Sequence, residues 1–109
     1  MGKQAFTGGL RTPGFNATWP FAHLTLTDDG MTLRLFGLVH TRRDWSRVQS
    51  VQRVVGGMLG SPGVRIILAD GRRIVFWTFS VDAVLAAFQG HGVPVVETGG
   101  QPPKVWLGT

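Results

Sequence analysis

The chain has 109 residues, of which 43% are hydrophobic and 16% charged, a composition that is typical of one folded domain and excludes a disordered chain. It contains no cysteine, which excludes disulfides, thiolate nucleophiles and zinc–thiolate sites. The net charge of +5 rests on 11 lysines and arginines against 6 acidic residues, and this balance favours anionic partners.

The chain begins with a segment of low regularity. Residues 1–18 contain glycine, threonine and proline without a sustained hydrophobic period, and we expect an irregular N-terminal arm. From residue 21 the pattern changes, because apolar and polar residues alternate over 22–27 and again over 31–35. The Asp-Asp-Gly at 28–30 is typical of a tight turn, so the sequence predicts a β-hairpin here.

The middle of the chain predicts shorter elements. Residues 38–41 indicate a third strand, and residues 44–48 resemble one helical turn that leads into a fourth strand at 51–55. The glycine-rich stretch 56–63 predicts a loop.

A second hairpin is predicted over residues 64–79, since β-branched and aromatic residues flank the Asp-Gly turn at 70–71. Residues 93–96 indicate a last short strand, with Pro94 favouring a sheet edge.

One amphipathic helix is predicted between these segments. Ser80 is expected to act as its N-cap, with the hydroxyl accepting a hydrogen bond from the first turn. Val81, Val84, Leu85 and Phe88 recur at helical spacing and form one apolar stripe. We therefore expect this face to pack against the sheet.

The order and spacing of several segments carry a family resemblance. These segments are LTLTDDG at 24–30, DWSRVQSV at 44–51, GVRI at 63–66, DGRRIVFWT at 70–78, the helix at 81–88 and GVPV at 92–95. Together they resemble the bacterial pleckstrin-homology-like (PH-like) class, which is related to GRAM domains. In such domains a W-x-x-V/I-x-x-V segment, matched here from Trp45 to Val51, crosses from the first sheet to the second.

The resemblance implies a mainly β (α+β) fold, a bent β-sandwich or partial barrel of about seven strands capped by one C-terminal helix. It places the PH-like domain at 19–97, between the arm at 1–18 and a C-terminal tail at 98–109. The tail contains the large apolar residue Trp106. Its presence there would be explained if the tail docks into a groove of the same chain or of a second one.

Phosphoinositide-binding relatives carry lysines and arginines in the loop that joins their first two strands. We equate that loop with residues 27–30, which are acidic here. Because two carboxylates repel a phosphate group, the sequence argues against headgroup binding at the usual site.

The polar residues suggest no reaction centre. His23, His40 and His91 lie far apart in the sequence, and no pair has the spacing of metal ligands. The acidic pair at 28–29 is explained by its turn. We therefore expect no enzymatic activity, no metal and no cofactor.

Arg53, Met58, Leu59 and Arg65 form the predicted partner-binding surface. Met58 and Leu59 lie in a glycine-rich segment where no strand or helix period buries them, and arginine is enriched at interfaces. The alternative is a lid, in which the apolar pair folds back over the open end of the barrel.

A second basic group surrounds Trp45 and comprises Arg42, Arg43 and Arg47. Arginines beside an aromatic ring are typical of platforms for single-stranded nucleic acid. However, the position of Trp45 in the crossing segment predicts burial. We likewise expect Trp19 and Trp77 to provide core area.

These observations predict a non-enzymatic binding and scaffolding module of PH-like type, with a protein as the expected partner. An anionic membrane surface and a second copy of the chain are alternatives, and a small basic nucleic-acid-binding protein is the less favoured one. No apolar run approaches the ~20 residues that span a bilayer, and the first residues lack a secretory signal. We expect a cytoplasmic location, with peripheral attachment at the inner membrane face as an option.

Overall fold

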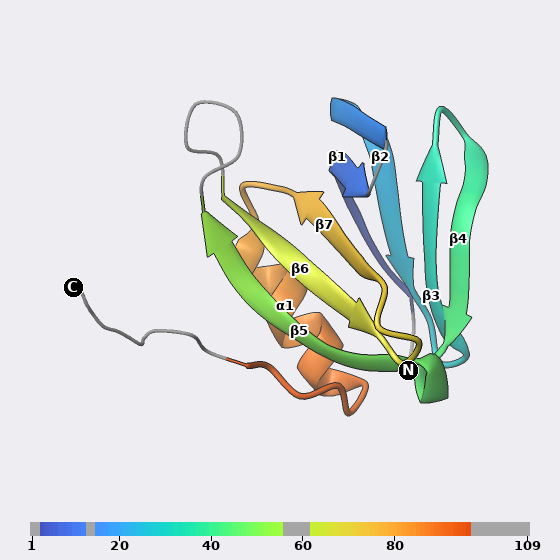
Figure 1. Cartoon of the computed structure of the whole chain (residues 1–109), viewed down its shortest axis with the longest axis vertical. Coiled ribbons are helices and arrows are strands. Elements are labelled where there is room, and N and C mark those ends of the chain that lie inside the picture. Colours follow the sequence, from blue (N-terminus) through green and yellow to red (C-terminus); the bar gives the residue numbers. More distant parts are fainter. Residues whose placement is uncertain (1–2, 13–14, 56–61, 97–109) are drawn as a thin grey trace.

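The computed structural model of the chain describes residues 3–12, 15–55 and 62–96. Within these ranges it has seven strands, one 3₁₀ turn and one α-helix (Figure 1). The elements are β1 (Gln4–Thr12), β2 (Phe15–Leu26), β3 (Gly30–Leu35), β4 (Leu38–Asp44), η1 (Trp45–Arg47), β5 (Val48–Val55), β6 (Pro62–Leu68), β7 (Arg73–Trp77) and α1 (Val81–Gly90). The predicted mainly β fold with one C-terminal helix is confirmed for these residues.

The strands form a single antiparallel sheet in the order β4-β3-β2-β1-β7-β6-β5. β1 joins the two halves, because it pairs with β2 along most of its length and with β7 at residues 9–11. In Figure 1 the sheet is bent, with β1–β4 on one side, β5–β7 on the other and α1 packed on β5 and β6. This arrangement turns the inner faces of both halves toward one core.

The two predicted hairpins are present. In the first, Leu24 lies opposite Leu33 and Leu26 opposite Met31, and all four side chains are buried. Strand neighbours alternate between faces, which explains why the polar residues between them point outward. The second hairpin pairs β6 with β7 in the same way. The turn of the first depends on Gly30, because a Cβ atom there would lie 2.1 Å from the carbonyl oxygen of Arg43 in β4.

The helix stripe is also confirmed, since Val81, Val84, Leu85 and Phe88 are buried. The expected cap is wrong, because the side chain of Ser80 makes no capping hydrogen bond. The main-chain N–H of Ser80 instead donates to the hydroxyl of Thr78 at 3.0 Å. Packing of the apolar stripe, rather than a serine cap, therefore stabilises the start of α1.

The irregular N-terminal arm is wrong, because most of it lies in strand β1 and the start of β2. Gly8 and Gly9 interrupt the alternation there, and this hid the strand from pattern analysis. Glycine is needed at both positions because the main chain of a neighbouring strand lies too close to leave room for a side chain. A Cβ atom on Gly8 would lie 2.0 Å from the carbonyl oxygen of Trp77, and one on Gly9 would lie 2.7 Å from that of Ala17. At Gly8, therefore, β1 approaches β7 too closely for any side chain to fit.

Several boundaries also differ from the expectations. β4 continues to Asp44, β5 begins at Val48 directly after η1, and β6 begins at Pro62 inside the expected loop. The expected strand at 93–96 is wrong, because this segment makes only one isolated parallel bridge, from Val95 to Val51.

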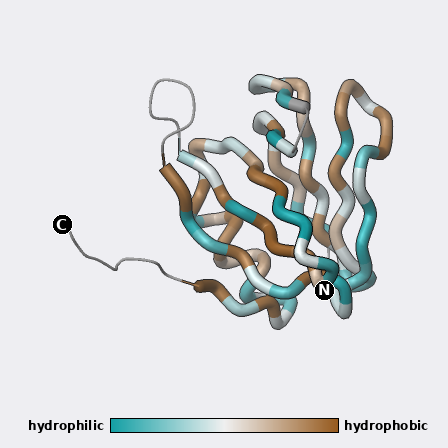
Figure 2. The backbone as a smooth tube through the Cα atoms, in the orientation of Figure 1, coloured by the Kyte–Doolittle hydropathy of each residue, from teal (hydrophilic) through white to brown (hydrophobic). Residues whose placement is uncertain are grey.

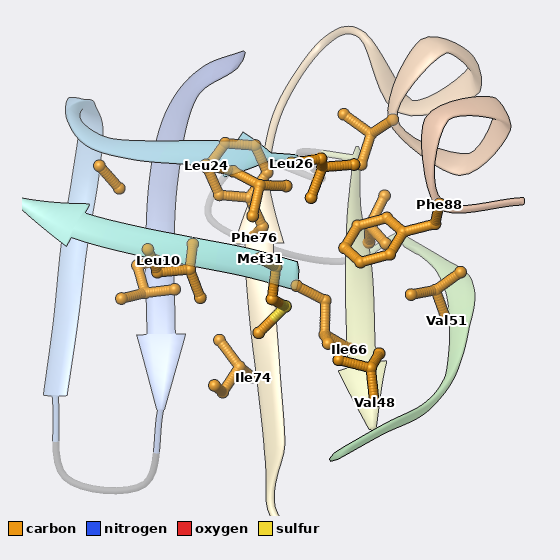
Figure 3. Packing of buried hydrophobic residues seen from close by; sticks show 14 of the residues in the cluster. Leu10, Leu24, Leu26, Met31, Val48, Val51, Ile66, Ile74, Phe76 and Phe88 are labelled. Atoms are coloured by element: carbon orange, nitrogen blue, oxygen red, sulfur yellow. The ribbon is translucent and has the colours of Figure 1, made fainter. Parts of the chain in front are cut away.

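The core is built from both halves of the sheet and from α1. Figure 3 shows Leu24, Met31 and Phe76 meeting at its centre, with Phe88 of α1 projecting toward Val51 of β5. The labelled residues are almost fully buried, so their substitution is expected to be costly.

Candidate binding surface

Of the predicted surface, Met58 and Leu59 lie outside the described residues. The two arginines are placed on neighbouring strands, with Arg53 opposite Val64 and Arg65 opposite Gln52. These are adjacent cross-strand pairs, and adjacent pairs face opposite sides of a sheet. Arg53 and Arg65 are therefore not brought together.

Both arginines also have intramolecular partners. A nitrogen of Arg53 lies 2.6 Å from a carboxylate oxygen of Asp82 at the start of α1. Arg65 donates to the side-chain oxygen of Gln52 at 2.8 Å. The role of the loop between them stays a prediction, but these arginines do not form one cationic patch.

The acidic turn at 27–30 joins β2 to β3. It is not the loop between the first two strands, as the sequence predicted, because β1 precedes β2. Residues 13–14, between β1 and β2, lie outside the described residues. Asp28 and Asp29 therefore do not lie at the site that binds headgroups in phosphoinositide-binding relatives.

Trp45 is half-buried and engaged on several sides. Its indole N–H donates to the carbonyl oxygen of Thr27 at 2.9 Å. Its ring meets Phe88 edge to face at 5.9 Å between centroids and stacks on His91 at 4.6 Å. A ring held in this way is not available for stacking with a nucleic-acid base.

A different surface stands out for its exposed apolar side chains. Five of them lie in the middle of β2 and around the turn between β3 and β4, and we call this group the apolar tip: Trp19, Phe21, Phe36, Leu38 and Val39. Figure 2 shows the turn between β3 and β4 as a hydrophobic segment at one extremity of the sheet. Large exposed apolar groups of this kind mark interaction sites in soluble proteins.

The tip is organised around two phenylalanines. The rings of Phe21 and Phe36 lie 5.1 Å apart between centroids, and the amide of Phe36 donates to the carbonyl oxygen of Phe21 at 3.0 Å. Phe36 has a φ of +52°, and Gly37 follows with a φ of +84°. The left-handed region is unfavourable for a bulky side chain and is often retained for function.

Trp19 belongs to the tip and not to the core, contrary to expectation, with 59% of its surface exposed. Its main-chain nitrogen lies against Gly9, which pairs with Trp77 at the end of β7. Two residues further along β2, Phe21 contacts Phe36, and this places Trp19 near the β3–β4 turn.

Sequence reasoning missed the tip, although one signal was present. Residues 36–39 read Phe-Gly-Leu-Val, a run of apolar residues across a hairpin turn. A turn cannot bury every side chain of such a run, so exposure of some of them is expected.

The outer face of β2–β4 lies beside the tip. His23, Arg34 and Val39 form one cross-strand row, and Thr25, Thr32 and Arg42 form the next. A hollow of about 620 Å³ follows this face, and its charged lining residues are Lys3, Asp29, Arg34, Arg42, Arg43 and Asp44. Cations outnumber carboxylates there, so the face attracts anions.

Carboxylates are unevenly distributed. Most of those in the described residues lie in the turns opposite the tip, namely Asp28, Asp29, Asp44 and Asp70 (Figure 1). The remaining described carboxylate is Asp82, which pairs with Arg53. Among the described residues, β2, β3 and the β3–β4 turn carry no carboxylate, and the one in β4 is Asp44, the last residue of that strand.

Asp44 has a structural role at this opposite end. It accepts hydrogen bonds from the hydroxyl and the amide of Ser46 and so caps η1. The Ser46 hydroxyl is the main cause that holds the pKa of Asp44 below its ordinary value.

Among residues 3–12, 15–55 and 62–96, no three histidine or acidic side chains gather as metal ligands would. In the same residues no helix has the length and apolarity needed to cross a membrane. Comparison with protein-family models, curated proteins and solved structures gives no match.

Proposed function

We propose that this chain is a non-enzymatic binding module of PH-like type that docks on its partner through the apolar tip. The observation that carries the proposal is the exposure of Trp19, Phe21, Phe36, Leu38 and Val39 at one extremity of a rigid sheet. Exposed clusters of large apolar side chains are typical of interaction sites.

The PH-like part is supported by the order of the elements. Four strands form one half of the sheet, three form the other, and a single helix follows them and packs on the sheet. This is the order that the sequence resemblance implies. The fold class by itself assigns no activity, so the function rests on the tip.

The nucleic-acid alternative receives less support. Its aromatic platform was Trp45, and that ring packs on Phe88 and His91. The tip includes Leu38 and Val39, whose aliphatic side chains offer no π-face for a base.

Photo-cross-linking in the native cell tests the proposal. A benzophenone amino acid replaces Phe36, and a matched variant carries it at Arg72, which lies in the turn at the opposite end. We expect adducts from position 36 and none of the same mass from position 72. The proposal is overturned by equal labelling from both positions or by no adduct from position 36.

A further inference from the structure

We infer that a second surface of this chain, on the outer side of β1, β7 and β6, binds single-stranded nucleic acid. Four side chains define this surface, which we call the arginine face: Arg11 of β1, Arg65 of β6, and Arg73 and Trp77 of β7. The arginine face shares no residue with the apolar tip. The inference therefore goes beyond the proposed function and does not depend on it.

The register of the sheet brings the arginines together on one face. Arg65 lies directly opposite Val75, and Val75 lies directly opposite Arg11, so the three form one row across β6, β7 and β1. Residues directly opposite each other project from the same face of a sheet. Arg73 lies two residues from Val75 along β7 and therefore joins that face. Neighbouring strands are about 4.8 Å apart, so the Cα atoms of Arg65 and Arg11 are separated by about 10 Å.

The arginine face points away from the core. Phe76, which follows Val75 in β7, is fully buried, so Val75 and the residues of its row project outward. The helix α1 packs on β5 and β6 through side chains that belong to the core, and it therefore covers the inner side of these strands. Arg11 and Arg73 are exposed, and Arg65 is half-buried. A ligand can reach all three side chains.

The charge of this face is not neutralised within the described residues. The sequences of β1, β5, β6 and β7 contain no aspartate or glutamate. The carboxylate closest in sequence to Arg73 and Arg65 is Asp70, which accepts a main-chain hydrogen bond in the turn between β6 and β7. Arg65 donates to Gln52 at 2.8 Å, and an amide leaves the charge of Arg65 intact. Arg11 and Arg73 form no ion pair with a described residue, so the face attracts polyanions.

Trp77 adds an aromatic ring to the arginine face. Contrary to expectation it lies outside the core, opposite Gly63 and Gly9 on the outer side of β7, and it is half-buried. A Cβ atom on Gly63 would lie 2.7 Å from a carbon of the indole, so the ring occupies the space above β6 that a side chain at 63 would fill. An indole that rests on main chain and is partly exposed can stack with an unpaired base.

Single-stranded nucleic acid matches both parts of the face. Its phosphates are attracted by arginines, and its bases stack on aromatic rings with little dependence on sequence. Trp45 does not supply such a ring, because it packs on Phe88 and His91, whereas Trp77 contacts no other aromatic ring among the described residues. In a duplex the bases stack on one another, and an acidic protein segment offers carboxylates without bases. These polyanions are outcomes of the test below.

The test is fluorescence anisotropy of labelled oligo(dT) and oligo(rU) strands of about 20 nucleotides, titrated with the full chain. Binding of either strand supports the inference, and the tighter one identifies DNA or RNA. Each arginine at a phosphate contributes about −0.7 to the slope of log association constant against log salt concentration, so three give about −2. No binding at about 50 mM salt with up to about 100 μM protein would overturn the inference.

Charge variants supply a matched pair. Arg73→Gln is expected to weaken binding at least about fivefold at 50 mM salt and to make the salt slope shallower by about 0.7. Arg42→Gln removes the same charge from an exposed position of β4, in the other half of the sheet, and is expected to leave both quantities unchanged. Arg42 belongs to the group around Trp45, so the pair also compares the two surfaces. Equal effects of the two substitutions would overturn the inference.

Variants of Trp77 test the stacking. Trp77→Leu is expected to weaken binding at least about fivefold, because the base loses its aromatic partner. Trp77→Phe keeps a ring and is expected to retain most of the affinity. A stacked base quenches an indole, so the oligonucleotide should quench the intrinsic fluorescence of the chain, and Trp77→Phe should remove that quenching. Quenching that persists in Trp77→Phe would place the strand at another tryptophan and overturn the inference.

The remaining outcomes concern other polyanions and the proposed function. A duplex, poly-L-glutamate or phosphatidylglycerol vesicles bound as tightly as the single strand would overturn the inference. The double variant Phe36→Ser with Leu38→Ser is expected to bind the oligonucleotide as the unchanged chain does, and a loss of that binding would also overturn it. Oligonucleotide binding without adducts from position 36 would overturn the proposed function alone, and adducts without oligonucleotide binding would overturn this inference alone.

Discussion

The indole of Trp45 lies almost parallel to the imidazole of His91, with ring centroids 4.6 Å apart and planes inclined by 15°. His91 follows α1 directly, and its other side reaches the amide oxygen of Gln4 at 3.1 Å. One stack therefore connects η1, the end of α1 and the start of β1, which are far apart in the sequence. The Trp45 indole adds a hydrogen bond to Thr27.

The first prediction concerns this stack. Trp45→Phe keeps an aromatic ring but leaves the carbonyl oxygen of Thr27 without its indole donor. The carbonyl oxygen still accepts from the amide of Gly30 at 3.3 Å. We therefore expect the free energy of unfolding to fall by about 0.5–1.5 kcal/mol, the usual net contribution of one hydrogen bond. Urea denaturation measures it. An unchanged midpoint would show that the hydrogen bond contributes no stability.

The second prediction concerns the docking of α1. Phe88 is fully buried, so Phe88→Ala is expected to lower the free energy of unfolding by about 3–5 kcal/mol. Phe79 is 82% exposed just before the helix, and Phe79→Ala is expected to change it by less than about 0.5 kcal/mol. Thermal denaturation of both variants checks this, and similar losses would mean that α1 is not docked through Phe88.

The third prediction concerns the meeting of β1 with β7. Gly8→Ala is expected to destabilise the chain by about 1–3 kcal/mol, because the added methyl group overlaps the carbonyl oxygen of Trp77. Gly90→Ala adds the same group at the end of α1, where no atom lies within 4 Å. There the change is expected to be neutral or stabilising by up to about 1 kcal/mol. Chemical denaturation compares the free energies of unfolding of the two variants. A larger loss for Gly90→Ala than for Gly8→Ala would contradict the close approach of β1 to β7.

The fourth prediction separates stability from binding at Phe36. Asparagine tolerates a positive φ better than phenylalanine, so Phe36→Asn is expected to leave the free energy of unfolding unchanged or raise it by up to about 1 kcal/mol. The same variant is expected to bind its partner more weakly. Denaturation measures the first, and photo-cross-linking from position 38 with and without the Phe36→Asn change measures the second. A clear loss of stability would indicate a structural role for the ring.

The fifth prediction concerns acid. The pKa of Asp44 is lowered in the folded chain, chiefly by the Ser46 hydroxyl, so this carboxylate contributes stability above its unfolded pKa. That contribution is lost as the pH falls through the folded pKa. Ser46→Ala is expected to raise the pKa of Asp44 toward its ordinary value, as an NMR titration of the carboxyl carbon would show. If the pKa of Asp44 is the same in the variant, the Ser46 hydroxyl is not the cause of the lowered pKa.

Elements with strong local patterns were predictable from the sequence. The alternation before and after the turn at 28–30 predicted the first hairpin, and the spacing from Val81 to Phe88 predicted α1. β1 was not predictable in this way. Its glycines are selected by contact with Trp77 and Ala17, which come from other parts of the chain, so no local period records them.

The candidate surface was harder to predict for a related reason. Burial of a tryptophan depends on where its strand lies in the finished sheet, and sequence alone could not distinguish the exposed Trp19 from the half-buried Trp45. The arginines at 53 and 65 looked like neighbours on either side of a loop. The register of β5 and β6 puts them on opposite faces.

The segment after α1 has a consequence for assembly. The amide of Val51 donates to the carbonyl oxygen of Pro94 at 3.0 Å, and the amide of Val96 donates to that of Val51 at 2.8 Å. These bonds cover part of the β5 edge, which would otherwise offer its main chain to a strand of another molecule. A chain truncated after Gly92 would have an uncovered edge and would be prone to polymerise by strand addition, however stable its core.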